Sequence, residues 1–441
     1  MTSSPHPRRP QPSGRTREAQ RRRRAKKRRQ ARLRVFFTGF ACLALIAALA
    51  TTGAALWKKY LPAVETTASA DGSLSAALPA APSLPPPDPQ PVISTVKFSA
   101  TGDNLIHDGI YTQARQRTQD GSYDFGPLYE NLRGFYAGFD VNWINQETLV
   151  TDELPPSSYP QFCTPAACGQ AIYDLGMRVI AMANNHTYDK YAEGIAATLR
   201  FWDSMPDDVV TTGLWADEAD YSRIPMHEVN GVKIAYLAYT QYTNGLPIPQ
   251  GAAAHMILTE QEDVIQRQVE LARQQADVVV VGCHWGTEGS HTIHDSQRAL
   301  GQKLADWGAD VIIGTHPHMV QGIDMLTSAD GRSVPIAYSL GNFVSTQMYA
   351  DNMISYIFTF DITKTTQPDG TSSIAIDHVR AVPAVTHYDA GYKNVREYLL
   401  RDYTPELAAA HGCRANSPAF SYDYIRQVLA DNIEQQYIQW D

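Results

Sequence analysis

Short apolar runs alternate with stretches of helical periodicity between Val96 and Ser339, and this alternation limits the fold more than any other feature of the chain. Apolar strands that alternate with helices across short turns are typical of an α/β fold. The expected strands are Val96–Ala100, Val179–Ala183, Lys233–Tyr239, Val278–Cys283, Val311–Ile313 and Pro335–Ser339, and the expected helices are Phe125–Gly134, Gly194–Met205, Glu260–Gln275 and Asp295–Gly308.

The pattern changes after residue 350. Ser355–Thr363 and Ser373–Val379 alternate apolar and polar residues on either side of Pro368-Asp369-Gly370, which predicts an antiparallel hairpin. The tail from Ser421 to Ile438 has helical periodicity. One domain is therefore predicted over 96–441, with its motifs in 96–350 and a C-terminal hairpin and helix in 351–441.

The N-terminal segment has a different character. A basic tail (1–34) precedes an uncharged run of 23 residues, 35–57, and a Pro- and Ala-rich stretch, 58–95. At about 1.5 Å per residue the run spans roughly 34 Å as a helix, enough for a hydrocarbon core of ~30 Å. We expect an uncleaved single-pass anchor, a cytoplasmic N-terminus, a disordered linker and an extracellular main domain at the cell membrane. A cleaved signal peptide or a basic nucleic-acid-binding tail also fits parts of this segment.

The charge of the chain is segregated. Residues 1–34 hold 14 of the 37 Lys and Arg and one of the 46 Asp and Glu, so the remainder carries 23 basic against 45 acidic residues, a net of −22. Such a body is a poor nucleic-acid binder. Five cysteines cannot form a disulfide framework, although a Cys163–Cys168 disulfide is favoured over two free thiols outside the cytoplasm.

A polar cluster follows most of the expected strands. Because ligand-binding residues of α/β folds gather at the carboxyl ends of strands, these clusters predict a site. The sharpest is His316-Pro317-His318, since two imidazoles beside a proline bend can point together. Taken alone, each cluster also has a structural interpretation as a helix cap, a solvated edge strand, a turn or a packed core histidine. The candidates are Asp103 with His107, Asn145 with Glu147, Asn185 with His186, His284 with Glu288, and His316 with His318.

The residue types of these clusters indicate a metal site. Carboxylate, imidazole and amide groups without a thiolate suit Mn, Fe or Zn rather than a cysteine-type structural zinc. Two such divalent ions would activate a water and hold a phosphoryl group for in-line attack.

The ordered segments GDN, NQET, NNHTYD, HWGTE, GTHPHMVQG and YSLGNF resemble the capsule synthesis protein CapA family, also called the poly-γ-glutamate synthesis family, over roughly residues 96–350. That family looks like a branch of the calcineurin-like metallophosphoesterase superfamily. The resemblance implies a four-layer α/β/β/α sandwich with metals between the sheet edges, in a protein that is membrane-anchored or exported.

The resemblance also implies roles for single residues. His186 matches the general acid of the family, and Asn185 would bridge metal and phosphate. Leu105 and Thr315 depart from the superfamily pattern, which has His after Asp-x and no insertion in Gly-His-x-His. The matched metal ligands are Asp103, Glu147, Asn185, His284, His316 and His318, and the additional candidates are His107, Asn145 and Glu288.

Three functions fit this sequence. The first is a metal-dependent phosphoesterase-type hydrolase that acts on an anionic substrate during capsule, poly-γ-glutamate or envelope polymer synthesis. The second is a non-catalytic factor that binds the polymer and couples it to capsule-synthesis membrane proteins. The third is a transferase that moves a polymer chain to a cell-wall acceptor.

Overall fold

The computed structural model describes residues 89–249, 252 and 255–441. The chain divides into two compact units, Met1–Pro86 and Pro87–Asp441, and every described residue belongs to the second. The expected basic tail, the expected anchor and residues 58–88 of the expected linker therefore lie outside the described residues. Within the described ranges, no helix combines the length and the apolar character that crossing a bilayer requires.

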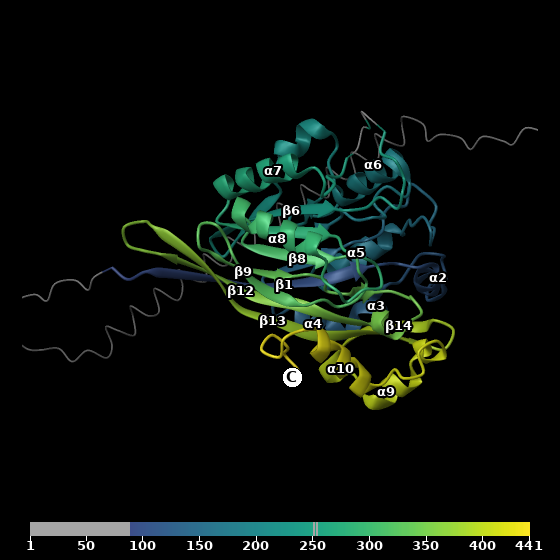
Figure 1. Cartoon of the computed structure of the whole chain (residues 1–441). Coiled ribbons are helices and arrows are strands. Elements are labelled where there is room, and N and C mark those ends of the chain that lie inside the picture. The colour runs from purple at the N-terminus through teal and green to yellow at the C-terminus, as the bar shows by residue number, and fades with distance from the viewer. Residues whose placement is uncertain (1–88, 250–251, 253–254) are drawn as a thin grey trace, which may run out of the picture. The chain divides into compact units, whose positions relative to one another are not determined.

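Eight strands form a mixed sheet in the order β14-β13-β12-β1-β2-β3-β4, with β11 beside β1 (Figure 1). The strands from β1 to β4 are parallel to one another. On the other side of β1, β12 is antiparallel to β1, β13 to β12 and β14 to β13. The parallel half brings the carboxyl ends of its strands to one edge. The strands are β1 (Val92–Asn104), β2 (Val141–Asn145), β3 (Val179–Ala181), β4 (Val210–Thr212), β11 (Asn342–Val344), β12 (Ile354–Thr366), β13 (Ser372–Asp389) and β14 (Lys393–Leu399).

Six strands form a second mixed sheet in the order β5-β6-β7-β8-β10-β9. Its four central strands are parallel, and the edge strands β5 and β9 are antiparallel to their neighbours. The strands are β5 (Met226–Val229), β6 (Val232–Thr240), β7 (Val278–His284), β8 (Val311–Thr315), β9 (Ile323–Thr327) and β10 (Ser333–Ala337).

The central strands of the second sheet are apolar without interruption, because both faces of that sheet are buried. In β7, Val279 and Val281 belong to the core shared with helices α7 (Glu262–Gln275) and α8 (Asp295–Trp307). Val278 and Val280 belong to the larger core shared with the eight-stranded sheet. Successive side chains of a strand point to opposite faces, so one strand serves both cores.

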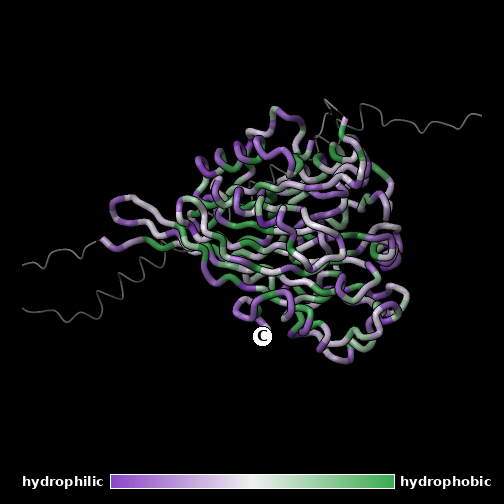
Figure 2. The backbone as a smooth tube through the Cα atoms, in the orientation of Figure 1, coloured by the Kyte–Doolittle hydropathy of each residue, from purple (hydrophilic) through white to green (hydrophobic). Residues whose placement is uncertain are grey.

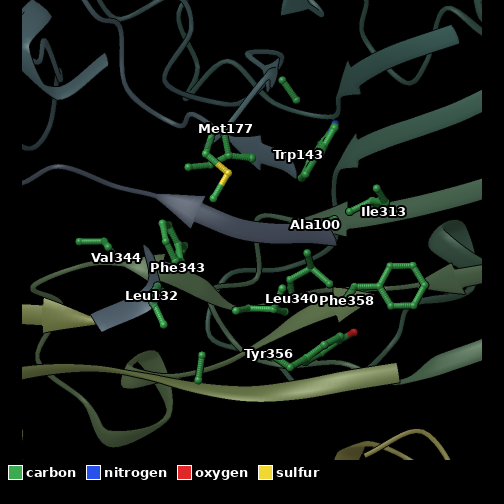
Figure 3. Packing of buried hydrophobic residues seen from close by; sticks show 14 of the residues in the cluster. Ala100, Leu132, Trp143, Met177, Ile313, Leu340, Phe343, Val344, Tyr356 and Phe358 are labelled. Carbon is green, nitrogen blue, oxygen red and sulfur yellow. The ribbon is translucent and has the colours of Figure 1, made fainter. Parts of the chain in front are cut away.

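The larger core lies between the two sheets. Trp143 of β2 and Ala100 of β1 lie opposite Ile313 of β8 (Figure 3). The rings of Phe98 and Tyr236, from different sheets, are 6.4 Å apart. The expected α/β class is thus confirmed as an α/β fold with two mixed sheets, and the tube of Figure 2 is mostly hydrophobic along the strands and hydrophilic at the tip of the β12–β13 hairpin.

The other helices lie around the sheets, and two of them pack beneath β13 at the C-terminal end (Figure 1). They are α2 (Asp108–Gln116), α3 (Gly126–Tyr129), α4 (Arg133–Tyr136), α5 (Ala166–Leu175), α6 (Tyr191–Trp202), α9 (Pro405–Ala410) and α10 (Tyr422–Asn432).

Two expected helices are shorter in the structure than the sequence predicts. The expected helix at Phe125–Gly134 is divided into α3, a 3₁₀ turn and α4, so the periodicity over this stretch does not produce one continuous helix. The expected helix at 421–438 ends at Asn432, because Ile438 leaves it to form a bridge with Ala381 of β13. Two backbone hydrogen bonds of 2.8 and 2.9 Å to Ala381 replace the last helical turns. The expected hairpin is confirmed as β12 and β13.

The favoured Cys163–Cys168 disulfide is wrong for this structure. Both residues are free thiols, as are Cys283 and Cys413 among the described cysteines. Cys168 is on α5 and its Sγ lies 3.9 Å from Asn104 Nδ2 and 3.7 Å from the Tyr129 hydroxyl. The thiol is therefore packed in a polar pocket of the core, and burial raises the pKa of Cys168 to about 12.

Candidate metal centre

The candidate residues meet where the carboxyl edges of the two sheets adjoin. In the first sheet, Asp103 of β1 is in register with Asn145 of β2, and Asn145 with Ala181 of β3. In the second sheet, His284 of β7 is in register with Thr315 of β8. Because the strands are parallel, the residues that follow them leave at the same edge.

Glycines allow close approach of the backbone at this edge. A Cβ atom on Gly102 would collide with the carbonyl oxygen of Gly341, and that carbonyl accepts a hydrogen bond of 3.1 Å from the Asp103 amide. A Cβ atom on Gly314 would collide with the carbonyl of Tyr338. Only glycine permits this spacing, which holds the Asp103 and His316 segments against β11 and β10.

The paired histidines have strained backbones. His316 has a φ of 100° and His318 a φ of 56°, both in the region that favours glycine. Each such residue costs about 1–3 kcal/mol and persists only where surrounding contacts hold it. The His316 amide donates to Asp103 Oδ2 at 3.2 Å, and the Pro317 carbonyl accepts from Gly289 at 2.8 Å. Strain held in this way is typical of a functional site.

Two groups of three side chains converge on Glu147. The first group is Asp103, Glu147 and His318, and the second is Glu147, His284 and His316. In each group the candidate ligand atoms all lie within 4.8 Å of one another, and every member is buried. One carboxylate shared by two sets of ligands is the arrangement that a pair of neighbouring cations would need.

The Glu147 carboxylate has the least satisfied environment of the cluster. The side chain is fully buried, and neither oxygen has a hydrogen-bond partner among the described residues. Oε1 lies 3.6 Å from His284 Nε2 and 3.7 Å from His318 Nε2. Burial and the nearby Asp103 carboxylate raise the pKa of Glu147 well above its ordinary value. Because a buried carboxyl without a hydrogen-bond donor is costly, the cluster fits a bound cation at this position.

Two of the imidazoles are held neutral. Burial and the neighbouring imidazoles lower the pKa of His284 well below its ordinary value and that of His316 to about 3. Burial also tends to lower the pKa of His318, but the Glu147 and Asp103 carboxylates outweigh burial and raise this pKa to about 10. Neutral imidazole nitrogens have the free lone pairs that a cation requires.

Asn185 extends the second group. Its Oδ1 lies 2.9 Å from His284 Nε2, and that same nitrogen lies 3.1 Å from His316 Nδ1. An amide oxygen, two imidazole nitrogens and Glu147 Oε1 thus face one point. Oxygen and nitrogen donors without a thiolate suit Mn, Fe or Zn.

His186 lies beside this group and is paired with an acid. Its Nδ1 is 2.8 Å from Asp189 Oδ2, and that oxygen also accepts a hydrogen bond of 2.6 Å from the Phe162 amide. His186 is 5% exposed and the Phe162 ring edge packs on its imidazole. The pairing fixes Nδ1 toward the carboxylate, so Nε2 is the nitrogen that remains for chemistry.

The three additional candidates lie outside both groups. Asn145 Nδ2 donates to Asp103 Oδ1 at 2.7 Å and so orients that carboxylate. His107 is half-buried, its Nδ1 is 3.2 Å from the Leu105 carbonyl, and burial lowers its pKa to about 4. Glu288 is exposed and lines a hollow of about 300 Å³ that reaches His316.

Sequence reasoning did not assign two residues that orient the cluster. Asp189, three residues after His186, appears in the NNHTYD segment but was not given a role. Asn342 belongs to the SLGNF segment, for which no ligand contact was expected, and its Oδ1 lies 2.9 Å from His318 Nδ1. The Asn342 amide in turn donates to the Asn352 carbonyl at 3.0 Å. Such hydrogen bonds set the tautomer of a metal-binding histidine.

Comparison with known proteins gives a family match. The model of the bacterial capsule synthesis protein family PGA_cap matches residues 97–347. The PGA biosynthesis protein CapA of Bacillus subtilis is 31% identical over 299 residues, which are 66% of this chain and 74% of that protein. The capsule biosynthesis protein CapA of Bacillus anthracis is 34% identical over 186 residues, which are 40% of this chain and 42% of that protein.

Solved structures give more distant matches. The NAD nucleotidase of Haemophilus influenzae is 12% identical with a TM-score of 0.39, covering 79% of this chain and 64% of that chain. The 5'-nucleotidase of Candida albicans is 7% identical with a TM-score of 0.34, covering 76% of this chain and 57% of that chain. This chain thus spans less than two thirds of each of these two nucleotidases.

Proposed function

Because the chain belongs to the bacterial capsule synthesis protein family PGA_cap, we propose that it is a metal-dependent phosphoesterase-type hydrolase acting in capsule, poly-γ-glutamate or envelope polymer synthesis. One observation carries the proposal. The Glu147 carboxylate is fully buried, has no hydrogen-bond partner among the described residues and belongs to two groups of candidate ligands at once. A structural carboxylate would have hydrogen-bond donors in this position.

The residues present fit two divalent cations. Asp103, Glu147 and His318 would hold one, and Glu147, His284, His316 and Asn185 would hold the other. Bound there, Mn, Fe or Zn would supply Lewis acidity, lowering the pKa of a water and polarising a phosphoryl group. Asn145 and Asn342 would keep their hydrogen bonds and orient Asp103 and His318.

His186 is the proposed general acid. Its Nδ1 faces the Asp189 carboxylate at 2.8 Å, which directs Nε2 away from Asp189. A proton held on Nε2 can pass to the leaving oxygen of a phosphoester. The Phe162 ring, packed edge-on against this imidazole, limits the access of water to it.

We also propose that the protein is a single-pass membrane protein with a cytoplasmic N-terminus and an extracellular catalytic domain. The support is the order of basic tail, 23-residue uncharged run and Pro-rich stretch in 1–95. Envelope polymer and capsule-synthesis membrane proteins are its proposed partners.

The deciding experiment is metal analysis and turnover on the full-length chain, purified without chelator. We expect about two transition-metal ions per chain, fewer in the double variant His316→Ala/His318→Ala, and hydrolysis of p-nitrophenyl phosphate or bis(p-nitrophenyl) phosphate. His186→Ala should lower turnover and leave the metal content unchanged. His378→Ala is the matched control, since that side chain is 74% exposed on the β12–β13 hairpin.

The outcomes separate the functions. Absence of bound metal after incubation with Mn or Zn would refute the metalloenzyme. Two bound ions without turnover of any phosphoester, and polymer output that survives His186→Ala, would favour the non-catalytic polymer-binding factor.

A further inference from the structure

Several exposed large apolar side chains follow strands of the two sheets in the sequence. Eight large apolar side chains are exposed among the described residues, and five of them follow the carboxyl ends of strands β2, β3, β6 and β11. Four of the five are tyrosines. The five are Tyr159, Tyr191, Tyr242, Met348 and Tyr349, with exposed fractions between 37% and 78%.

Contacts tie these segments to the site. The Tyr242 ring lies 4.9 Å from the His316 ring, and its hydroxyl donates to the Gly286 carbonyl at 2.9 Å. Gln347, next to Met348, accepts a hydrogen bond from Asn342. Tyr242 is thus an exposed aromatic side chain in contact with the candidate metal centre.

Tyr242 lines two hollows. One is the hollow of about 300 Å³ that reaches His316, and its rim carries Asn244, Thr287 and Glu288. The other is also about 300 Å³. It is lined by Gln241, Tyr242, Thr259, Glu260, Glu262, Trp285, Ser296, Gln297 and Leu300.

Neither hollow is lined by Lys or Arg among the described residues. Their carboxyl groups are those of Glu260, Glu262 and Glu288, of which Glu262 is paired with Lys303 at 2.6 Å. The other ionisable side chains of the two linings are Tyr242 and His316. A polycarboxylate chain would meet carboxylates of its own sign here, which is unfavourable. Hydroxyls, by contrast, can donate to carboxylates and exchange hydrogen bonds with Gln and Ser side chains.

A sugar ring matches these groups. Its apolar C–H face can pack on an aromatic ring, and its hydroxyls need the amide, hydroxyl and carboxylate partners that line the second hollow. We propose that Tyr242 and the second hollow form a saccharide subsite, so that the phosphoester cleaved at the metal centre carries an uncharged sugar unit. This inference rests on the proposed function for the cleavage step, and the sugar binding itself does not depend on turnover.

The test is equilibrium binding to the full-length chain, measured by saturation-transfer NMR with a fixed panel of probes. The neutral probes are chitotriose, cellotriose and maltotriose, and the anionic probe is tri-γ-glutamate. We expect at least one neutral probe to bind and the anionic probe to bind more weakly. Tyr242→Ala should weaken sugar binding about tenfold, whereas Tyr242→Phe should preserve most of it because the ring remains.

Two further variants make the result specific. Met325→Ala removes a side chain that is 39% exposed, similar to Tyr242 at 37%, but lies on β9 away from both hollows, and it should leave binding unchanged. Glu260→Lys should raise the affinity for tri-γ-glutamate and lower that for the sugar. Binding of tri-γ-glutamate in preference to every sugar, or failure of all three sugars to bind, would overturn the inference.

Metal analysis of the same samples separates the two proposals. Sugar binding without metal or turnover would overturn the proposed hydrolase and retain the subsite. Bound metal and turnover without sugar binding would retain the proposed hydrolase and overturn the subsite.

Discussion

Substitution of Glu147 by Gln tests the shared-ligand geometry most directly. The change keeps the size of the side chain and removes its negative charge. Because both candidate ligand groups contain Glu147, the variant should lose affinity at both positions. Asp103→Asn or His284→Ala affects one group each and should leave about one ion per chain.

The size of the expected stabilisation follows from the coupling of cation binding to folding. A cation present at 100 times its Kd stabilises the folded chain by about 2.7 kcal/mol, and two such cations by about twice as much. Unfolding entropy of about 2.1 cal/mol/K per residue gives roughly 0.7 kcal/mol/K for a unit of about 350 residues. Saturating metal should therefore raise the melting temperature of the natural chain by about 7 °C and that of Glu147→Gln by little.

Without metal, the Glu147→Gln variant is expected to be no less stable than the natural chain. In the absence of metal, the buried carboxyl has no hydrogen-bond partner among the described residues, and its pKa is raised by burial and by Asp103. A neutral amide avoids the cost of burying that carboxyl, and His318 keeps the Asp103 carboxylate at 3.2 Å, so Glu147→Gln should melt at or above the temperature of the natural chain in EDTA. Differential scanning calorimetry with and without Mn or Zn measures both effects. A variant that keeps two ions, or that melts several degrees lower in EDTA, would refute the shared-ligand reasoning.

Two further predictions concern residues outside the metal ligands. Asp189→Asn keeps an oxygen for the Phe162 amide but removes the charge beside His186, so kcat on a phosphoester should fall by about 10² with unchanged metal content; an unchanged kcat would exclude the pairing from catalysis. The Asp351–His291 ion pair, 3.1 Å long, raises the pKa of His291 against burial and lowers that of Asp351. Its stabilisation is present between the ordinary values of 3.8 and 6.5, is lost as pH falls through the lowered pKa of Asp351, and is lost as pH rises through the raised pKa of His291. Asp351→Asn should thus cost about 1 kcal/mol near pH 5.5 and little near pH 9, which urea unfolding at the two pH values measures; equal costs would contradict the pairing.

Much of the fold is determined by local sequence. Continuous apolar runs such as Val278–Cys283 form strands because both faces of a central strand are buried, and the turn Pro368-Asp369-Gly370 ends one strand and begins the next. The three-residue strands β11 and β4 were not expected, whereas β3 is equally short but lies in the longer apolar run Val179–Ala183 that predicted it. The end of α10 also depends on a partner, because Ile438 pairs with Ala381, far away in sequence.

The candidate ligands were chosen from sequence because polar residues directly after apolar runs have a fixed position at the sheet edge. Which of them share a centre was decided by the tertiary structure. The junction of two sheets brings Asp103 of the first beside His318 of the second, at 3.2 Å. The same junction makes Glu147 common to both groups.

Sequence alone thus determined many of the strands, the residue types of the site and the edge where they collect, since these follow from local periodicity and motif order. The pairing of His186 with Asp189, the support of His318 by Asn342 and the free thiols of Cys163 and Cys168 depend on where side chains point after packing. That direction is set by contacts between segments remote in sequence, as when β11 supplies Asn342 to a histidine that follows β8.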